Sequence, residues 1–504
     1  MKAFLLYKNI DFDMNQPLPW NEQALVQDLE LDTLFTAMAV DDKFLYDVIK
    51  KTVLTSIHNT PEIILYRQSV LKDCLKNPTI LRNIYNIVVE TIESEKKIYW
   101  GILSKYPIAI LDRSVEVLQM YIRALKKIRD IANEFSEQFV SEGFKTLFAM
   151  LKRELSDEYF AEIQNHLQIL KFRDGVLISA ELGKGNKGIN YVLRNPTNLR
   201  KSWLERIFNL DKTPIYSYTI AERDDAGARA LSDLRDRGIN NVANALAQSC
   251  DHILSFFTML RIELAFYMGC LNLSEQLAQM EAPICIPTPT EKEKRIHNGQ
   301  GIYDVCLVLT QKQKAIGNDL NADNKYLVII TGANQGGKST FLRAIGLSQL
   351  MMQSGMYVPA VSFSANVCDH LFTHYKREED TTMISGKLDE ELSRMNDIVN
   401  HITPNSMLLF NEAFAATNER EGSEIASQIT TALLEDHLKV FFVSHLYEFA
   451  HSFYERKLEN AIFLRAGRQK DGKRTYRLLE GEPLQTSYGR DLYNKITQKV
   501  NIAS

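Results

Sequence analysis

Apolar residues recur at intervals of three and four positions along residues 22 to 165. One example is the run of Val115, Leu118, Tyr121, Ile122, Leu125 and Ile128. This spacing places the apolar side chains on one face of a helix. Because glycine is almost absent from this part of the chain, few positions interrupt the helices. The pattern therefore predicts long packed helices whose intervening charged residues face solvent.

The pattern changes from helical to alternating near residue 175. Every second residue from Val176 to Leu182 is apolar, as in a strand with one buried face. The next segment, GKGNKG at 183–188, is typical of a turn, and residues 189–193 can return as a second strand. We expect a small β element inserted between helices.

Helical spacing resumes over residues 226–280. Its most apolar part, residues 256–273, contains Arg261 and Glu263, which favours a buried helix over a membrane span. The proline-rich segment 282–294 ends this region and is the best candidate for a domain boundary.

Short apolar runs alternate with helical segments in the C-terminal part of the chain. Three of these runs lie at residues 326–330, 407–410 and 440–443. Such alternation predicts a mostly parallel sheet with covered faces. Two runs end in polar pairs, Asn411-Glu412 and Ser444-His445, and these would lie at the carboxyl edge of the sheet, where ligands bind in open α/β folds.

Composition narrows the class of protein. The chain has 504 residues, 45% of them hydrophobic, enough for roughly two to four packed domains. With 59 basic and 63 acidic residues the net charge is −4, so any contact with nucleic acid depends on a local basic surface. Six scattered cysteines argue against a disulfide framework or a zinc site and favour a reducing cytoplasm. The N-terminus does not fit a signal peptide, and we expect no membrane partner.

The stretch KYLVIITGANQGGKSTF at 325–341 carries the main candidate chemistry. Its residues satisfy G-x-x-x-x-G-K-[ST], in which glycines let backbone N–H groups surround phosphates, the lysine adds charge and the serine can ligate Mg²⁺. The helix N-terminus adds partial positive charge. The alternative is a glycine-rich loop with a solvated lysine. We expect ATP and Mg²⁺ as cofactors, with the nucleotide bound by Gly332, Asn334, Gly336, Gly337, Lys338, Ser339 and Thr340.

A phosphate-loop ATPase also needs an acidic strand end that helps hold Mg²⁺ and orients the attacking water. Glu412 is in place for the water, whereas Asn411 occupies the metal position without the charge of the expected aspartate. His445 could donate a hydrogen bond to the terminal phosphate, although a lone histidine after a strand is often structural. We therefore predict Glu412 and His445 as catalytic residues, and Ser339 with Asn411 behind it as the Mg²⁺ site.

Basic residues gather in and after the expected turn. Between positions 184 and 206 a single acidic residue, Glu205, stands against Lys184, Lys187, Arg194, Arg200, Lys201 and Arg206. Lysines at a glycine-rich hairpin tip could neutralise DNA phosphates without recognising sequence. A solvated turn is the alternative, since charged hairpin tips are common. The candidate DNA contacts are Lys184, Lys187 and Arg194.

Several strings give the chain a resemblance to the MutS family of DNA repair ATPases. They are TGANQGGKSTFLR (331–343), SGMYVPA (354–360), LLFNEAFAATNEREG (408–422), FFVSHLYEF (441–449) and QTSYG (485–489), in the family's order and spacing. The string GNDL (317–320) precedes the first nucleotide strand as it does in the family. PEIILYRQSVLKDCL (61–75) is similar to the start of its helical core.

The resemblance implies a multidomain fold: an all-α core and lever at 1–284, with a small β-containing clamp inserted at about 171–225, followed by an α/β P-loop ATPase domain of the ABC type at 285–504. It further implies a homodimer with composite ATP sites, acting as an ATP-controlled clamp in repair or recombination on mismatched, branched or distorted double-stranded DNA. Because the chain begins at the helical core, we expect it to lack the family's N-terminal mismatch-recognition domain.

Three departures from the family pattern leave a second function open. Asn411 replaces the expected aspartate, the usual glycine-rich turn is Phe-Ala-Ala at 414–416, and the Ser-Thr-Phe signature is SGKL at 385–388. The signature would face the partner's phosphates, so these changes would weaken hydrolysis. The alternative function is a nucleotide-binding scaffold with little ATP hydrolysis that recruits a protein partner, for which a downstream repair protein is one candidate. A transporter or chromosome-structure ATPase is less favoured, since we find no LSGGQ-like signature or long heptad arm.

Overall fold

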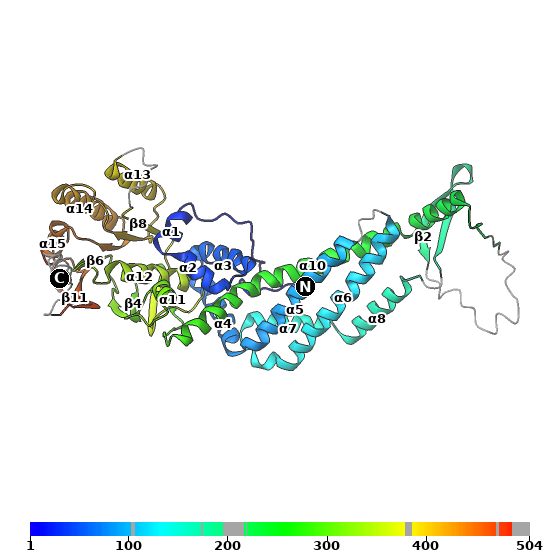
Figure 1. Cartoon of the computed structure of the whole chain (residues 1–504), viewed down its shortest axis with the longest axis horizontal. Helices are drawn as coiled ribbons and strands as arrows, with labels where there is room; N and C mark the ends of the chain where they lie inside the picture. Colours follow the sequence, from blue (N-terminus) through cyan, green and yellow to red (C-terminus); the bar gives the residue numbers. More distant parts are fainter. Residues whose placement is uncertain are drawn as a thin grey trace, which may run out of the picture. The chain divides into compact units, whose positions relative to one another are not determined.

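The computed structural model describes residues 1–101, 106–172, 175–194, 216–217, 219–377, 386–469 and 473–485. The chain forms two compact units (Figure 1). The first unit comprises residues 1–3, 79–139 and 144–262, and the second comprises 4–78, 140–143 and 263–504. Helices dominate the first unit and mixed sheets the second, so the chain is a multidomain α/β protein. The domain limits expected from the sequence, with a clamp at about 171–225, stay predictions.

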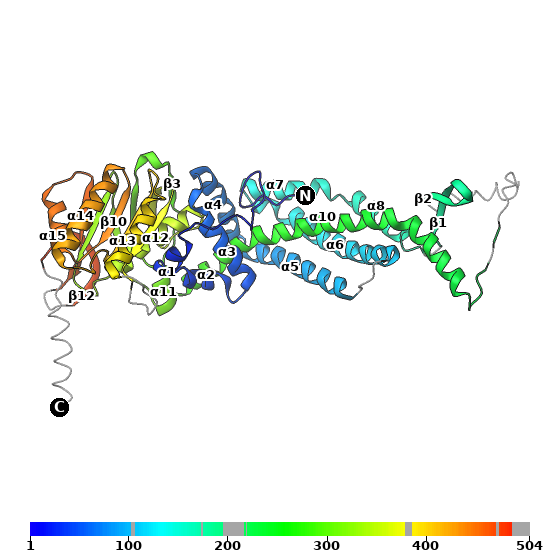
Figure 2. The ribbon, with the colours of Figure 1, turned by 90° about the horizontal axis from the view of Figure 1, so that it is seen from above.

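Long helices build the first unit (Figure 2). They are α5 (Pro78–Gly101), α6 (Pro107–Phe135), the 3-10 turn η2 (Ser136–Gln138), α7 (Glu142–Glu154), α8 (Asp157–Ile169) and the first part of α10 (Asp225–Gln279). The predicted helical region is confirmed. All six residues of the apolar example in α6 are buried: Val115, Leu118, Tyr121, Ile122, Leu125 and Ile128.

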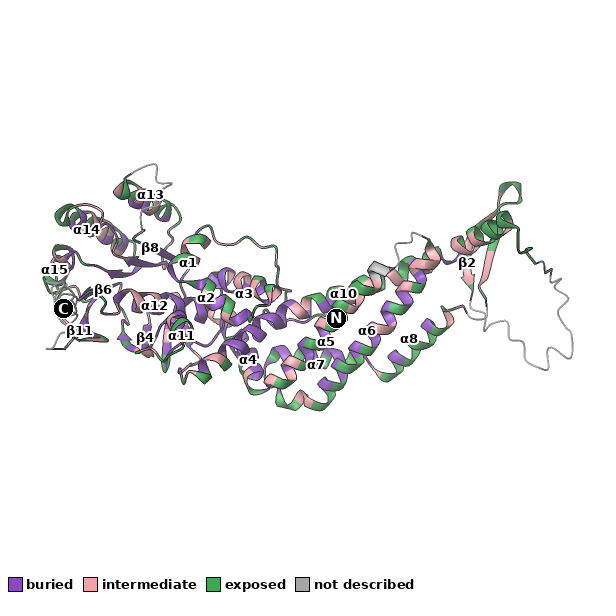
Figure 3. Cartoon of the chain, in the orientation of Figure 1, coloured by how far each residue is buried: buried purple, intermediate pink, exposed green. Residues whose placement is uncertain are grey.

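An antiparallel hairpin interrupts the helices of the first unit, as the alternating pattern predicted. Its strands are β1 (Leu177–Leu182) and β2 (Gly188–Arg194), joined through the turn η3 (Lys184–Asn186). Val176 and Leu193 pack against a buried cluster that includes Ile239 of α10. Gly238 allows this close approach, because a Cβ there would lie 2.4 Å from Cδ1 of Ile178. Most of the hairpin near its turn is exposed (Figure 3).

The helix α10 contains the most apolar stretch of the chain. One 18-residue window has a mean hydropathy of 1.4, which by length and composition would suffice to cross a membrane. Within the structure, 67% of that window is buried. Burial inside the fold therefore accounts for the apolar run, in agreement with the prediction of a buried helix.

Two sheets lie in the second unit. The larger has the order β12-β11-β6-β10-β9-β8, with β12 antiparallel to β11 and the other neighbours parallel. Its strands are β6 (Leu327–Gly332), β8 (Leu371–Tyr375), β9 (Met407–Asn411), β10 (Lys439–Val443), β11 (Ala461–Arg468) and β12 (Arg474–Glu480). The smaller sheet, in the order β3-β7-β4-β5, consists of β3 (Thr288–Thr290), β4 (His297–Ile302), β5 (Asn318–Asn321) and β7 (Ser362–Asn366). The mostly parallel sheet expected from the sequence is confirmed.

Helices cover both faces of the larger sheet (Figure 1). On one face lies α12 (Lys338–Gln353), and on the other lie α13 (Lys387–Val399), α14 (Glu419–Glu435) and α15 (Tyr447–Glu455). Alternate residues of each strand point to opposite faces. Phe410 and Phe442 join the cluster under α13 to α15, while a Cβ at Gly346 of α12 would lie 2.6 Å from Leu409. The remaining elements are α1 (Glu22–Asp28), α2 (Leu31–Ala39), α3 (Lys43–Thr55), η1 (Ser56–His58), α4 (Pro61–Lys76), η5 (Lys292–Lys294) and α11 (Val305–Gln311).

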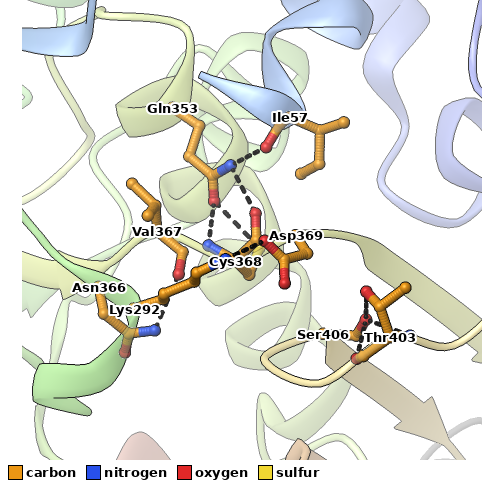
Figure 4. Close-up of polar contacts among 9 residues, drawn as sticks. All are labelled: Ile57, Lys292, Gln353, Asn366, Val367, Cys368, Asp369, Thr403 and Ser406. Atoms are coloured by element: carbon orange, nitrogen blue, oxygen red, sulfur yellow. Dashed lines mark hydrogen bonds and ion pairs between the residues drawn. The ribbon is translucent and has the colours of Figure 1, made fainter. Parts of the chain in front are cut away.

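A buried polar network holds the C-terminal end of α12 (Figure 4). Gln353 Nε2 donates to the carbonyl oxygens of Ile57 at 2.5 Å and Cys368 at 3.1 Å, and its Oε1 accepts from the Cys368 N–H at 3.0 Å. Beside it, Arg67 donates to the carbonyl oxygen of Ser354 at 3.3 Å. Because α12 begins in the glycine-rich loop, this network fixes the helix that presents the loop.

Candidate functional site

The glycine-rich loop connects β6 to α12 at the carboxyl edge of the larger sheet. Gly332 has a φ of 109°, and a Cβ there would lie 2.9 Å from the backbone nitrogen of Ala466. Gly337, the N-cap of α12, has a φ of 91°. Both conformations favour glycine, and at Gly332 the crowding by β11 also excludes a side chain. The loop therefore has the tight shape that its sequence pattern requires.

Lys338 is the first residue of α12 and is only 5% exposed. Its Nζ donates to the carbonyl oxygens of Gly332 at 3.1 Å and Ala333 at 3.2 Å. Burial lowers the pKa of Lys338 to about 8, Glu412 opposes this change, and the charge of Arg474 adds to it. The lysine is thus a buried cation held under the loop by backbone oxygens, at a helix N-terminus that also favours anions.

Ser339 and Asn411 meet across the site. The Ser339 hydroxyl donates to Oδ1 of Asn411, at the end of β9, at 2.8 Å. The Ser339 hydroxyl oxygen can bind Mg²⁺, which prefers oxygen ligands. The Asn411 amide oxygen lies behind it, and neither atom carries a charge. The two residues of the predicted Mg²⁺ site therefore lie together, and the donor set fits the metal when phosphate oxygens complete it.

Glu412 and His445 also meet at this edge. Nε2 of His445, which follows β10, lies 2.7 Å from Oε1 of Glu412. Since the carboxylate accepts, Nε2 is the protonated ring nitrogen. This hydrogen bond is the largest influence on the Glu412 carboxyl and lowers its pKa, against the effect of burial. Glu412 is therefore ionised at neutral pH.

A cavity of about 410 Å³ opens beside the loop. Gly337 and Thr340 contribute to it, together with Tyr303, Ile316, Phe341 and Tyr476. Mixed apolar and aromatic walls of this kind suit a planar ring. No sequence pattern predicted this cavity, because its walls come from separate elements, among them β4, α11, α12 and β12.

A residue of the string GNDL helps to form the cavity. Asn318, in the string GNDL, donates from Nδ2 to the carbonyl oxygen of Tyr476 at 3.1 Å and accepts from the Leu478 N–H at 2.7 Å. Its side chain therefore joins β5 to β12 and places Tyr476 in the wall. The string belongs to the family resemblance in the sequence, but only the fold shows its physical role.

The loop residues Asn334 and Gly336 differ in environment. Asn334 is exposed, and its carbonyl oxygen accepts from Nε of Arg474 at 3.1 Å. Gly336 is buried, and a Cβ there would lie 2.6 Å from the Ala466 side chain. Arg474, on β12, is thus a second basic residue at the loop, and no sequence motif predicted it.

The candidate DNA contacts lie elsewhere, on the hairpin of the first unit. Lys184 and Lys187 are both exposed in its turn, which closes through a 2.8 Å hydrogen bond from Gly183 N–H to the Lys187 carbonyl. Arg194 lies at the far end of β2, paired with Leu177, and its Nε donates to the Ser179 hydroxyl at 2.8 Å. The structure brings the two lysines together but not Arg194 with them.

Some predicted features fall outside the described residues. These are Arg200, Lys201, Glu205 and Arg206 of the basic segment, Ser385 of the altered signature, and positions 486–489 of the QTSYG string. Among the described residues, no group of three or more histidine, cysteine, aspartate or glutamate side chains could hold a metal ion.

Fold and site together define a class: a multidomain α/β protein in which a glycine-rich loop, a helix N-terminus and polar strand ends meet at one sheet edge. Comparison with known families then identifies the particular one. The family described as MutS2 N-terminal domain matches residues 59–280, and MutS domain V matches residues 328–500. The chain belongs to the MutS family.

Individual relatives agree with this assignment. The DNA mismatch repair protein MutS of Bacillus subtilis (strain 168) is 30% identical over 215 residues, or 40% of this chain and 25% of the relative. That of Thermotoga sp. (strain RQ2) is 33% identical over 188 residues, or 35% of this chain and 24% of the relative. For Lactobacillus acidophilus the match is 26% over 298 residues, 56% of this chain and 34% of the relative. This chain thus spans about a quarter to a third of the length of these relatives.

Proposed function

We propose that this chain is an ATP-dependent DNA-binding protein of the MutS type, a homodimeric clamp that acts in DNA repair or recombination on mismatched, branched or distorted DNA. The observation that carries the nucleotide part is the convergence of Lys338, Ser339, Asn411, Glu412 and His445 at one sheet edge. The MutS family membership and the curated relatives, each named a DNA mismatch repair protein, support the DNA part.

The loop and the neighbouring cavity suit the two ends of ATP. Backbone N–H groups of the loop, the α12 N-terminus and Lys338 would hold the phosphates. The cavity beside Gly337 and Thr340, with Tyr303 and Tyr476 in its walls, would take the base. A mononucleotide therefore accounts for both features with one ligand.

Ser339, with Asn411 behind it, would hold Mg²⁺. The metal would supply positive charge against the β- and γ-phosphate oxygens. On the protein side, Ser339 Oγ is directed at Asn411 Oδ1, so the amide orients the hydroxyl. Asparagine lacks the aspartate's charge, so this site holds Mg²⁺ less tightly than one with a carboxylate.

Glu412 would orient the attacking water. The pKa of its carboxyl is lowered, so the group is ionised, and before nucleotide binds its hydrogen bond to His445 fixes the direction of the side chain. His445 would donate instead to the terminal phosphate once nucleotide is bound. The hydrogen-bond partner of His445, at the end of β10, would therefore depend on whether nucleotide is bound.

The exposed turn of the hairpin would contact the DNA backbone. Lys184 and Lys187 are close together and solvated, which suits sequence-independent contact with phosphates. The family match from 59 to 280 includes this hairpin. We therefore assign the hairpin to the clamp, and such binding would weaken steeply with added salt.

A second function is favoured by one observation. Asn411 leaves the metal site without a carboxylate, and a protein that binds ATP but scarcely hydrolyses it would tolerate this change. Such a protein would act as a nucleotide-operated scaffold that recruits a downstream repair protein.

A binding panel tests the proposed function. Homoduplex, mismatched and four-way-junction DNA would be titrated at low and moderate salt, with and without ATP and Mg²⁺, while ATP hydrolysis is measured in parallel. We expect salt-sensitive binding, preference for distorted DNA and hydrolysis that responds to DNA. Absence of DNA binding at low salt with nucleotide present would contradict the clamp, and nucleotide binding without turnover would favour the scaffold.

A further inference from the structure

The turn that carries Glu412 has an unusual backbone. Glu412 and Phe414 both have left-handed conformations, with φ values of 55° and 61°. Residues with bulky side chains rarely adopt this region, because Cβ crowds the carbonyl oxygen that follows. A conformation of this kind persists when surrounding contacts hold it.

The near end of the turn is held by the sheet. The Glu412 N–H donates to the carbonyl oxygen of Val443, in β10, at 2.9 Å. The carboxylate of Glu412 in turn meets His445, which follows the same strand. These contacts fix the start of the turn at Glu412. They do not fix its other end at Phe414.

The far end of the turn is held by α13. Oε2 of Glu391 accepts a hydrogen bond from the backbone N–H of Phe414 at 3.0 Å. Glu391 is only 6% exposed, so water does not compete strongly for this bond. A side chain of α13 thus satisfies the N–H of the second left-handed residue.

His374 completes the arrangement. Its Nε2 lies 3.0 Å from the Glu391 carbonyl oxygen and therefore donates to it. Its ring stacks on the fully buried ring of Phe414, with centroids 5.3 Å apart and planes at 26°. Gly422 of α14 also leaves room for the turn, because a Cβ there would lie 2.4 Å from the Phe414 carbonyl oxygen.

We propose that Glu391 is a positioning residue for catalysis: through the N–H of Phe414 it holds the turn that carries Glu412, and so couples the position of α13 to the water-orienting carboxylate. This inference rests on the role proposed above for Glu412. Any movement of α13 would then be transmitted to Glu412 through the hydrogen bonds that Glu391 makes with Phe414 and His374, and through the ring contact between His374 and Phe414.

Two substitutions of Glu391 separate positioning from charge. Glu391→Gln keeps an oxygen acceptor for the Phe414 N–H, whereas Glu391→Ala removes it. We expect Glu391→Ala to lower kcat about tenfold, in the range of a misplaced catalytic group. The dissociation constant of a fluorescent ATP analogue, mant-ATP, should change less than about twofold, because the loop is held by its own contacts. Glu391→Gln should keep most of the activity, and Asp389→Ala, an exposed change on the same helix, serves as the control.

A second readout does not require turnover. Hydrogen exchange of a peptide spanning 412–416 should be faster in Glu391→Ala than in the wild type and unchanged in Asp389→Ala.

The outcomes are distinct for the two proposals. Three results would each overturn the positioning role. They are unchanged hydrogen exchange at 412–416 in Glu391→Ala, equal losses of kcat and mant-ATP affinity, and a Glu391→Gln variant that is as impaired as Glu391→Ala. If the wild type binds mant-ATP without hydrolysing it, the proposed catalysis fails. Faster exchange in Glu391→Ala would then show that Glu391 holds the turn without any role in catalysis, and this result also overturns the positioning role.

Discussion

The candidate ligand-binding side chains are fixed by contacts within the protein at the edge of the larger sheet, whereas those of the β1–β2 hairpin are exposed to solvent. At the sheet edge, Lys338 is 5% exposed and bonded to two carbonyl oxygens, and Ser339 is bonded to Asn411. At the hairpin, Lys184 and Lys187 are solvated, and neighbouring Leu182 is 79% exposed. The first region is organised before any ligand arrives, whereas the second would gain order from its partner. Single substitutions should therefore have large effects at the edge and small, additive effects at the hairpin.

The largest effect is expected at Lys338. Lys338→Ala should weaken nucleotide binding by about a hundredfold or more, because a buried cation facing the phosphates is lost together with its fixed geometry. Titration with mant-ATP measures this loss. Lys294→Ala, an exposed lysine in the same unit, is the matched control and should leave the affinity unchanged. If Lys338→Ala keeps its affinity for mant-ATP, the sheet edge is not organised for nucleotide before the ligand arrives.

The next effect concerns turnover. Glu412→Gln keeps the shape of the side chain and a hydrogen-bonding group for His445, but it removes the carboxylate that would orient water. We expect kcat to fall by on the order of a hundredfold while mant-ATP affinity is retained. Equally low turnover in the wild type and in Glu412→Gln would instead support the scaffold.

The burial of Lys338 also predicts an effect on stability. Its pKa falls from 10.5 to about 8, so at pH 7 the folded state carries a charge that burial disfavours. Lys338→Met should therefore raise the free energy of unfolding by about 2 kcal/mol at pH 7, after the loss of its carbonyl hydrogen bonds. The gain should shrink as pH rises from 8 to 10.5, where the unfolded lysine also becomes neutral. Urea unfolding at several pH values tests this, and a gain that does not depend on pH would contradict it.

The same contrast explains how far the sequence could predict the molecule. The loop was predictable because its pattern is local, and the polar pairs after β9 and β10 were predictable because parallel strands end at one edge. The cavity and the Glu391 contact were missed, since both depend on side chains brought together from distant segments. Residues 4–78 likewise pack with the sheet-containing unit although their helical pattern resembles that of the first unit. Periodicity predicts an amphipathic helix but does not identify the surface that it covers.

Asn411 is intermediate between the sheet edge and the hairpin in its expected effect. Its side chain is held by Ser339, but it lacks the charge of the aspartate expected at this position. Asn411→Asp should lower the Mg²⁺ concentration needed for half-maximal turnover by about tenfold, since a carboxylate behind Ser339 adds negative charge beside the metal that the amide lacks. Titration of turnover against Mg²⁺ measures the change. If Asn411→Asp leaves the Mg²⁺ dependence unaltered, Asn411 does not face the metal.

The smallest effect is expected at the hairpin. Lys184→Ala and Lys187→Ala together should weaken DNA binding only several-fold at moderate salt, because each lysine is one solvated contact among others. The informative quantity is the slope of log affinity against log salt concentration, which should become shallower by about two, or one per lysine removed, for every DNA tested. Nucleotide affinity should not change. Lys126→Ala with Lys127→Ala, a pair of exposed lysines of α6 in the first unit and outside the predicted clamp, is a charge-matched control that should leave the slope as it is. A loss confined to one DNA structure would show that the hairpin recognises shape, and the region would then be as specifically organised as the sheet edge.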